Sequence, residues 1–276
     1  MKKWYAVIGD PIAQSMSPVM HDAWFRENGI DATYIPIHVK AEQLGEAVAS
    51  LKRLGCSGWN VTVPHKCAII PYLDQVDEAA RRMNAVNTVK VLEDGTLFGT
   101  NTDGNGFVRS LQEFGASPEK NGELLVIGAG GAAAGISFAL ESAGFGQITI
   151  TNRTIGKAKK MSDAFPGSSA LSLDEAQLAL DKFDLIVQTT SVGMNFAKSG
   201  MPLDPTGISE GAIVADIIYN PLETEFLRRA SEVGGKTING VGMFVHQGAL
   251  AFELWTGAYP DTKKMIQLIS NDLGGK

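Results

Sequence analysis

The stretch ELLVIGAGGAA, residues 123–133, decides the fold that we predict for this chain. The apolar segment Glu123–Ile127 has the composition of a buried strand, and the glycine-rich residues after it open a helix that reaches about Ala143. A second strand, QITIT, follows at 147–151. G-x-G-x-x-A between a strand and a helix, with another strand beyond, is the dinucleotide-binding fingerprint in the context that it requires. The sequence therefore predicts a Rossmann-type domain.

The residues after the second strand favour NADP(H) over NAD(H). Asn152 lies about where an acidic residue would bind the ribose 2′-hydroxyl of NAD, and no carboxylate is present there. Arg153 follows directly, and Lys157 lies one helical turn later. Because an adenosine 2′-phosphate is dianionic, and arginine can both chelate it and stack on the adenine, these cations indicate an NADP site.

The N-terminal part of the chain predicts a second α/β unit. Strands are expected at 3–9, 32–39 and from Gly58, with helices at 17–28 and 41–54. This alternation indicates a mainly parallel sheet. A short helix is expected at 77–83, followed by a hairpin of strands at 85–91 and 96–100 around the turn signal at 93–95.

The rest of the chain continues the Rossmann-type pattern. Further strands are expected at 183–188, 212–216 and 236–238, and helices up to about 114 and at 223–233, 240–255 and 262–273. No strand follows the last two helices in the chain, so we expect these helices to pack back across both domains. The predicted domains are residues 1–103, completed by the helices of about 241–276, and residues 104–240.

Composition limits the class of protein. The 276 residues are 44% hydrophobic and 20% charged, which is typical of a globular protein, and the net charge of −6 argues against nucleic-acid binding. No signal peptide and no membrane-spanning run are apparent. Two cysteines, Cys56 and Cys67, suit a reducing cytoplasm, and their spacing around His65 matches no standard zinc site, so we expect no metal.

A polar strand end in the N-terminal part is the candidate reaction site. In GWNVTVPHK, residues 58–66, large or β-branched residues alternate with Asn60 and Thr62 until Pro64 ends the strand and Lys66 follows. Open α/β sheets present polar groups to ligands at such carboxyl ends. Taken alone, the stretch is better explained as a strand with a polar edge and an ordinary surface lysine.

Two serines precede the first predicted helix. Ser17 before Pro18 is expected to be the N-cap of that helix, and Ser15 could be a simple loop hydroxyl. Alternatively, two hydroxyls beside a helix N-terminus form a cradle for a carboxylate.

Seven peptides together resemble the shikimate dehydrogenase family. In the family's order they are Ser15-x-Ser17-Pro18, Asn60-Val-Thr62-Val-Pro-His-Lys66, Ala85-Val-Asn87-Thr88, Gly99-x-Asn101-Thr102-Asp103-Gly104, Gly128-x-Gly-Gly-x-Ala133, Asn152-Arg153-Thr154, and Gly240-x-Gly-Met243 with Gln247. The resemblance implies two α/β domains with a cleft between them, and NADPH-dependent reduction of 3-dehydroshikimate to shikimate.

The resemblance also implies roles for individual residues. Lys66 would donate the proton to the developing alkoxide and Asp103 would orient Lys66, whereas His65 gains no role. The substrate contacts would be Ser15, Ser17, Asn60, Thr62, Asn87, Tyr219 and Gln247. The cofactor contacts would be Gly128, Ala129, Gly130, Gly131, Ala132, Ala133, Asn152, Arg153, Thr154, Lys157, Thr189, Met194, Gly240 and Met243.

Two other functions stay open at this stage. One is a quinate/shikimate dehydrogenase of broader substrate and cofactor range, since pocket shape cannot be read from the sequence. The other is a non-catalytic, dinucleotide-binding regulatory module, against which the presence of both Lys66 and Asp103 counts. The expected partners are a small-molecule substrate and NADP(H), without nucleic acid or membrane, in a cytoplasmic monomer or homodimer.

Overall fold

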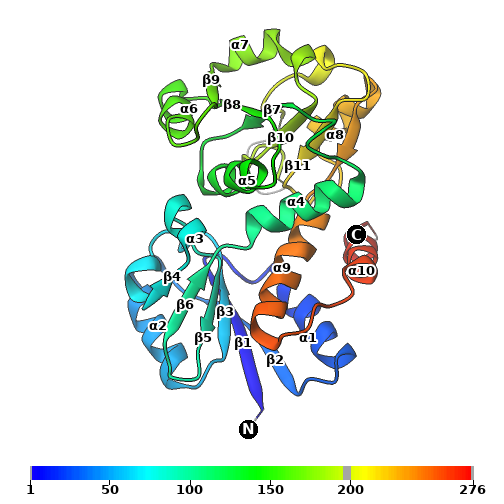
Figure 1. Ribbon diagram of the computed structural model, residues 1–276. Coiled ribbons are helices and arrows are strands. Elements are labelled where there is room, and N and C mark those ends of the chain that lie inside the picture. The colour runs from blue at the N-terminus through cyan, green and yellow to red at the C-terminus, as the bar shows by residue number, and fades with distance from the viewer. Residues whose placement is uncertain (1, 195–199, 275–276) are drawn as a thin grey trace. The chain divides into compact units, whose positions relative to one another are not determined.

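The computed structural model describes residues 2–194 and 200–274 (Figure 1). The chain forms two compact units, one of Met1–Asp103 with Val245–Met265 and the other of Gly104–Phe244 with Ile266–Lys276. The C-terminal helices α9 (Val241–Thr256) and α10 (Thr262–Gly274) each contribute residues to both units. The division differs from the sequence assignment in placing residues 241–244 and Ile266–Lys276 with the second unit.

The first unit contains a mixed but mainly parallel sheet, which confirms the predicted class. Its strands lie in the order β2-β1-β3-β5-β6-β4 (Figure 1). They are β1 (Lys3–Gly9), β2 (Ala32–His38), β3 (Gly58–Val61), β4 (Gln75–Val76), β5 (Thr88–Val91) and β6 (Leu97–Thr100). Strand β1 pairs in parallel with β2 and β3, and β5 pairs antiparallel with β3. Strand β5 also pairs antiparallel with β6, which is the predicted hairpin.

The helices of the first unit follow their apolar spacing. They are α1 (Ser17–Glu27), α2 (Leu44–Arg53), preceded by a 3-10 turn at Ala41–Gln43, and α3 (Glu78–Met83); a further 3-10 turn lies at Ile70–Tyr72. Leu44, Val48 and Leu51 of α2 are buried one or two turns apart on one face of the helix.

The prediction that Ser17 caps α1 is wrong. Ser17 is the first helical residue, because the Met20 N–H already bonds the carbonyl of Met16, which takes the cap position. The Ser17 N–H instead donates to the hydroxyl of Ser15 at 3.3 Å. The two hydroxyls therefore still lie together at the helix start.

A buried aromatic cluster lies beside β1 and β2 and surrounds His21 of α1. His21 is fully buried, stacks on Tyr34 with ring centroids 4.4 Å apart, and makes edge contact with Trp24. Neither ring nitrogen of His21 has a hydrogen-bond partner. Burial therefore lowers the pKa of His21 from 6.5 to about 3, and the ring stays neutral.

This depressed pKa predicts an acid-sensitive stability. Between pH 6.5 and about 3 the unfolded chain binds a proton at His21 that the folded chain does not, so the free energy of unfolding falls as the pH falls through this window. The expected loss is about 5 kcal/mol. In His21→Phe this part of the pH dependence should vanish in denaturant titrations across the window. If the free energy of unfolding of His21→Phe fell with pH as steeply as that of the wild type, the assignment to His21 would be contradicted. An equal change of this pH dependence in the control variant His38→Gln, at an exposed histidine, would contradict it as well.

The second unit has the strand order of a Rossmann sheet, as predicted. The order is β12-β11-β10-β7-β8-β9, with every neighbouring pair parallel (Figure 1). The strands are β7 (Glu123–Ile127), β8 (Gln147–Thr151), β9 (Ser169–Leu171), β10 (Leu185–Gln188), β11 (Ile213–Asp216) and β12 (Lys236–Ile238). In this topology ligands bind where the strand order reverses, here at the carboxyl ends of β7 and β10.

Helices cover both faces of this second sheet. They are α4 (Asp103–Phe114), α5 (Gly131–Ser142), α6 (Ile155–Ser162), α7 (Leu173–Leu178) and α8 (Glu225–Glu232), with 3-10 turns at Leu180–Lys182 and Pro205–Gly207. Alternate residues of β7 show the two faces: Leu124 and Val126 join the core that includes α4 and α5, whereas Leu125 and Ile127 join the core with α7 and α8. Successive side chains of a strand point to opposite faces of the sheet, and a parallel sheet with helices on both faces buries both sets.

Within the described ranges, no helix is long and apolar enough to cross a membrane.

Candidate active site

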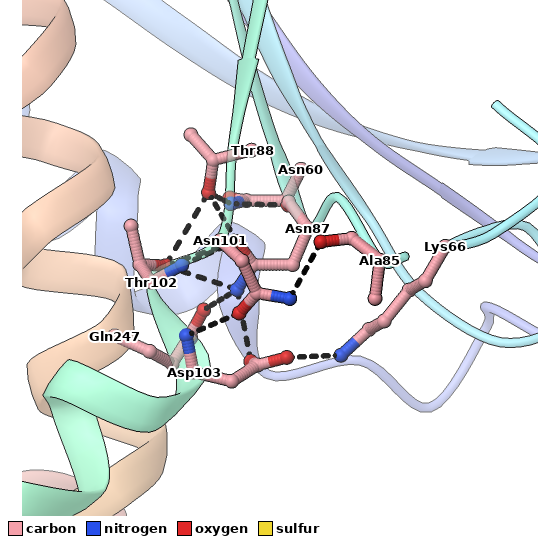
Figure 2. Close-up of polar contacts among 9 residues, drawn as sticks. All are labelled: Asn60, Lys66, Ala85, Asn87, Thr88, Asn101, Thr102, Asp103 and Gln247. Atoms are coloured by element: carbon pink, nitrogen blue, oxygen red, sulfur yellow. Dashed lines mark hydrogen bonds and ion pairs between the residues drawn. The ribbon is translucent and has the colours of Figure 1, made fainter. Parts of the chain in front are cut away.

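An ion pair between Lys66 and Asp103 lies at the centre of the site (Figure 2). The Lys66 Nζ donates to the Asp103 Oδ2 at 2.5 Å, and the two side chains are 27% and 12% exposed. Both groups belong to the first unit. A largely buried ion pair that remains open on one side can hold a charge and still reach a ligand.

Two hydrogen bonds, one from the side chain of His65 and one to the carbonyl of Lys66, fix the backbone around Lys66. After β3 the chain leaves the sheet, and the imidazole Nε2 of buried His65 donates to the carbonyl of Val39 at 2.6 Å. The carbonyl of Lys66 accepts from the N–H of Val86 at 2.8 Å. His65 therefore anchors the segment that carries Lys66, which agrees with its lack of an expected catalytic role.

Asp103 is fixed by the first turn of α4. Its N–H donates to the side-chain oxygen of Asn101 at 3.0 Å, while the amide of Asn101 donates to the carbonyl of Ala85 at 2.9 Å. The second carboxylate oxygen, Oδ1, accepts from Asn87 Nδ2 at 2.8 Å. Both carboxylate oxygens are thus engaged before any ligand arrives.

Asn87 connects Asp103 to the rest of the polar network. It is buried, its Oδ1 accepts from the N–H of Thr102 at 2.8 Å, and its Nδ2 lies 3.5 Å from the Oε1 of Gln247 on α9 (Figure 2). The structure therefore brings together four residues predicted from the sequence: Lys66, Asn87, Asp103 and Gln247.

Asn60 on β3 joins the same network with both amide hydrogens already used. Its Nδ2 donates to the carbonyl of Asn87 at 3.2 Å and to the Thr88 hydroxyl at 3.0 Å, and its Oδ1 accepts from the Tyr34 hydroxyl at 2.7 Å. Towards a ligand, Asn60 can offer only the remaining acceptor capacity of Oδ1.

The other predicted substrate contacts of the first unit lie outside this network. Ser17 is buried and Ser15 half-buried at the start of α1, and Thr62 is half-buried just beyond β3. No hydrogen bond or ion pair links these three residues to the Lys66 pair in the part of the chain that the structure describes. Thr62 packs tightly on Gly9, where an added Cβ would lie 2.4 Å from the threonine methyl group.

In the second unit, the glycine-rich loop has room beside it. Gly128 has φ +124°, and an added Cβ would lie 2.3 Å from the hydroxyl of Thr189, so only glycine fits there. Beside Gly130 and Gly131, in contrast, an added Cβ would meet nothing within 4 Å. Gly130 caps α5 without a side-chain hydrogen bond, which leaves first-turn N–H groups for an anion. Ala129, Ala132 and Ala133 complete the loop, with Ala133 buried in the core. This arrangement fits a dinucleotide pyrophosphate.

The cationic residues after β8 are exposed. Asn152 donates to the carbonyl of Thr154 at 3.1 Å, which orders the turn into α6. Arg153 and Lys157 are exposed, and neither has an ion-pair partner among the described residues. They are therefore available to a phosphate group.

Tyr219 lies in the second unit, on a loop held by Asp216. The Oδ1 of Asp216 accepts from the N–H of Ile218 at 2.9 Å, its Oδ2 accepts from the Thr224 hydroxyl at 2.8 Å, and burial raises the pKa of Asp216 to about 6. The ring of Tyr219 lies 4.9 Å from that of Phe244, and burial raises the pKa of its phenol. Tyr219 is thus a protonated hydroxyl at neutral pH.

The remaining predicted cofactor residues also lie in the second unit. At Gly240 an added Cβ would lie 2.1 Å from the carbonyl oxygen of Ile217, so this position requires glycine. Met194 is exposed, and Met243 is half-buried against the core. No group of three or more His, Cys, Asp or Glu side chains that could hold a metal ion occurs in residues 2–194 and 200–274.

Several residues that complete the site have no role that the sequence predicts. Thr88, Asn101 and Thr102 belong to the family-like peptides, but their contacts became apparent only in the structure. Tyr34 had no sequence signal at all, because an aromatic residue in a strand is ordinarily a core residue.

These features define a class: an α/β protein with a Rossmann-type dinucleotide-binding unit and a second unit that carries a lysine–carboxylate pair. Three family models match the chain: "Shikimate dehydrogenase substrate binding domain" over residues 7–89, "Shikimate / quinate 5-dehydrogenase" over 112–203, and "Shikimate 5'-dehydrogenase C-terminal domain" over 240–269.

Curated relatives and solved structures agree with these matches. The shikimate dehydrogenase (NADP(+)) of Lysinibacillus sphaericus (strain C3-41) is 55% identical over 275 residues, with 100% of both chains covered. A shikimate dehydrogenase crystallised in complex with NADP+ has a TM-score of 0.91 at 37% identity, covering 99% of this chain and 96% of that chain. The shikimate 5-dehydrogenase of Thermus thermophilus, in complex with NADP(H) and shikimate, has a TM-score of 0.89 at 37% identity, covering 97% and 98%. The chain belongs to the shikimate dehydrogenase family.

Proposed function

We propose that the protein catalyses the reversible, NADPH-dependent reduction of 3-dehydroshikimate to shikimate, a step of the shikimate pathway of aromatic amino-acid biosynthesis. The observation that carries this proposal is the Lys66–Asp103 ion pair, which is bonded to Asn87 and remains partly exposed. A protein that only binds a dinucleotide has no need of a half-buried proton donor that a carboxylate holds in place.

The proposed chemistry divides between the cofactor and the ion pair. Bound NADPH supplies the hydride for the carbonyl carbon. The ammonium group of Lys66 stabilises the negative charge that develops on the carbonyl oxygen and then donates its proton there, which yields the hydroxyl group of the product. Asp103 holds the ammonium group in place through Oδ2 and can accept a hydrogen bond from a neighbouring substrate hydroxyl. In the oxidative direction the same groups act in reverse.

The remaining polar residues are proposed to recognise the substrate. Ser15 and Ser17 would bind the ring carboxylate, because their hydroxyls lie beside the N-terminus of α1. Asn87 and Gln247 would bind ring hydroxyls, and Asn60 would accept from one. Thr62 and Tyr219 are proposed as further substrate contacts.

The second unit is proposed to bind NADP(H). Gly128, Gly130 and Gly131 would let the pyrophosphate approach the N-terminus of α5. Arg153 and Lys157 would bind the 2′-phosphate, with Asn152 and Thr154 shaping the turn between them. The remaining proposed contacts are Ala129, Ala132, Ala133, Thr189, Met194, Gly240 and Met243.

Replacement of Arg153 by alanine should reduce the preference for NADP. Because the lost contact is a charge-assisted bond to the 2′-phosphate, the KM for NADPH should rise by about 10- to 100-fold and that for NADH by less than about threefold. Lys160→Ala, at an exposed lysine of the helix α6 that follows Arg153, is the matched control and should change neither value. Equal effects of Arg153→Ala on the two cofactors would mean that the 2′-phosphate binds elsewhere.

The proposed reaction can be tested in the forward direction. With 3-dehydroshikimate and NADPH, the purified protein should lower the near-ultraviolet absorbance of the reduced nicotinamide as NADPH is oxidised. The amount of shikimate formed, identified by chromatography, should equal the amount of NADPH oxidised. Cofactor binding without shikimate formation would refute the proposal and favour a regulatory module.

A broader quinate/shikimate dehydrogenase is the second candidate, because one matching family model covers both activities. Turnover of quinate at a rate similar to that of shikimate would favour it. We further infer a cytoplasmic monomer or homodimer; the two cysteines are unpaired, as a reducing compartment would leave them.

A further inference from the structure

The hydroxyl group of Tyr34 lies behind the active site and contacts none of the proposed catalytic groups. Tyr34 is in β2, its side chain is 3% exposed, and its hydroxyl donates to the Oδ1 of Asn60 at 2.7 Å. Burial raises the pKa of this phenol well above its usual value of 10. The hydroxyl therefore keeps its proton and remains a donor at every pH at which the enzyme works.

The backbone determines which way the Asn60 side chain faces. The carbonyl of Asn87 can only accept, so the group of Asn60 that lies 3.2 Å from it must be the Nδ2 amide. The second amide hydrogen goes to the Thr88 hydroxyl. The Oδ1 of Asn60 thus faces Tyr34, and in the described part of the chain Tyr34 is its only hydrogen-bond donor.

The side-chain orientation of Asn60 determines which way the Thr88 hydroxyl donates, and this hydroxyl in turn helps to orient the side chain of Asn87. Since the Thr88 hydroxyl accepts from Asn60, its own proton is free to go to the Oδ1 of Asn87, 2.9 Å away. The N–H of Thr102, which can only donate, independently requires Oδ1 at that position of Asn87. The Nδ2 of Asn87 is thereby directed at the carboxylate of Asp103.

Four hydrogen bonds in one donor-to-acceptor direction therefore lead from Tyr34 to Asp103. They run through Asn60, Thr88 and Asn87, and the last three bonds are drawn in Figure 2. Every member other than the terminal carboxylate is less than 10% exposed, so water cannot easily replace a missing link.

We propose that Tyr34 is a positioning residue of this site, a role that rests on the function proposed above. Tyr34 acts through Asn60 and Thr88 to hold Asn87 in the orientation that binds the Oδ1 of Asp103. Asp103 in turn holds the ammonium group of Lys66. Loss of the Tyr34 hydroxyl leaves the Oδ1 of Asn60 buried without a donor, so Asn60 shifts and the bonds beyond it lengthen.

The primary test is Tyr34→Phe, which removes the hydroxyl and keeps the ring. We expect kcat for shikimate oxidation to fall about tenfold, with the KM for shikimate and for NADP changing less than about threefold, because the variant misplaces Asp103 without removing a binding group. Tyr5→Phe is the matched control: Tyr5 belongs to the same buried aromatic cluster, stacked on Phe25 and Trp255, but does not bond Asn60. Its kcat should stay within about twofold of wild type.

A double variant separates positioning from general loss of packing. Thr88→Val breaks the path between Asn60 and Asn87, so Tyr34→Phe should lower kcat by less than about twofold further in that background. A full tenfold effect on top of Thr88→Val, or a Tyr34→Phe variant with wild-type kcat, would overturn the inference. Thermal melting of each variant excludes unfolding as the cause of a lower kcat. If the wild-type protein itself fails to oxidise shikimate, the proposed function has failed, and the positioning role falls with it.

Discussion

Lys66→Ala is expected to lower kcat by about 10³-fold while the KM for shikimate stays within about threefold. The ammonium group of Lys66 is the proposed proton donor, and its charge matters most when negative charge has developed on the substrate oxygen. Because that interaction is stronger in the transition state than in the ground state, its loss appears in kcat. Steady-state rates of both variant and wild type, with NADP and shikimate, measure the effect.

Two further variants make the Lys66 result specific. Lys66→Arg keeps the positive charge but donates a proton poorly, so it should recover only a small part of the lost rate. Lys52 forms a surface pair with Asp74 at 3.8 Å in the same unit, and Lys52→Ala should leave kcat unchanged. A Lys66→Ala enzyme with near-normal kcat would remove Lys66 from the mechanism.

Asp103→Asn should lower kcat by about 10²-fold and raise the KM for shikimate by about tenfold. The substitution preserves the shape of the side chain but removes the charge that holds Lys66, and the amide nitrogen would face the ammonium group if Asn87 kept its present bond. The KM rises because the carboxylate is also the proposed acceptor for a substrate hydroxyl. Initial rates over a range of shikimate concentrations separate the two effects.

The matched control is Asp74→Asn, which removes the carboxylate of the surface pair and should change neither constant. Since Lys66 and Asp103 act as one group, the double variant Lys66→Ala/Asp103→Asn should be little slower than Lys66→Ala alone. Multiplicative losses would show that the two residues act independently, and the proposed pairing would be wrong.

The sequence predicted the regular elements of the fold well where they are long and buried. Strands β7, β8, β10 and β11 are largely buried runs of four or five mostly apolar or β-branched residues between turns, and the pattern predicted all four. Strand β4 has two residues and β9 has three, too few to show alternation, and neither was predicted. Helix α7 was also missed, although its capping box of Ser172 and Glu175 is a recognisable start signal.

The site residues could be predicted only in part, because their arrangement depends on distant segments. Lys66 and Asp103 are 37 positions apart, and no periodicity relates them, so their pairing was implied only by family resemblance. The direction of each hydrogen bond around Asn87 depends on backbone groups whose positions the fold alone determines. For the same reason Tyr34 of β2, which bonds Asn60 of β3 past the intervening strand β1, could not be recognised from the sequence.

The proposed activity is tested most directly by the oxidation assay of the wild-type protein with shikimate or quinate and NADP or NAD. The near-ultraviolet absorbance of the reduced nicotinamide reports turnover of each of the four combinations under identical conditions. Shikimate with NADP should be turned over rapidly, and the other three combinations should have a much lower kcat/KM. Absence of turnover in all four, by folded protein that binds NADP, would contradict the proposed activity.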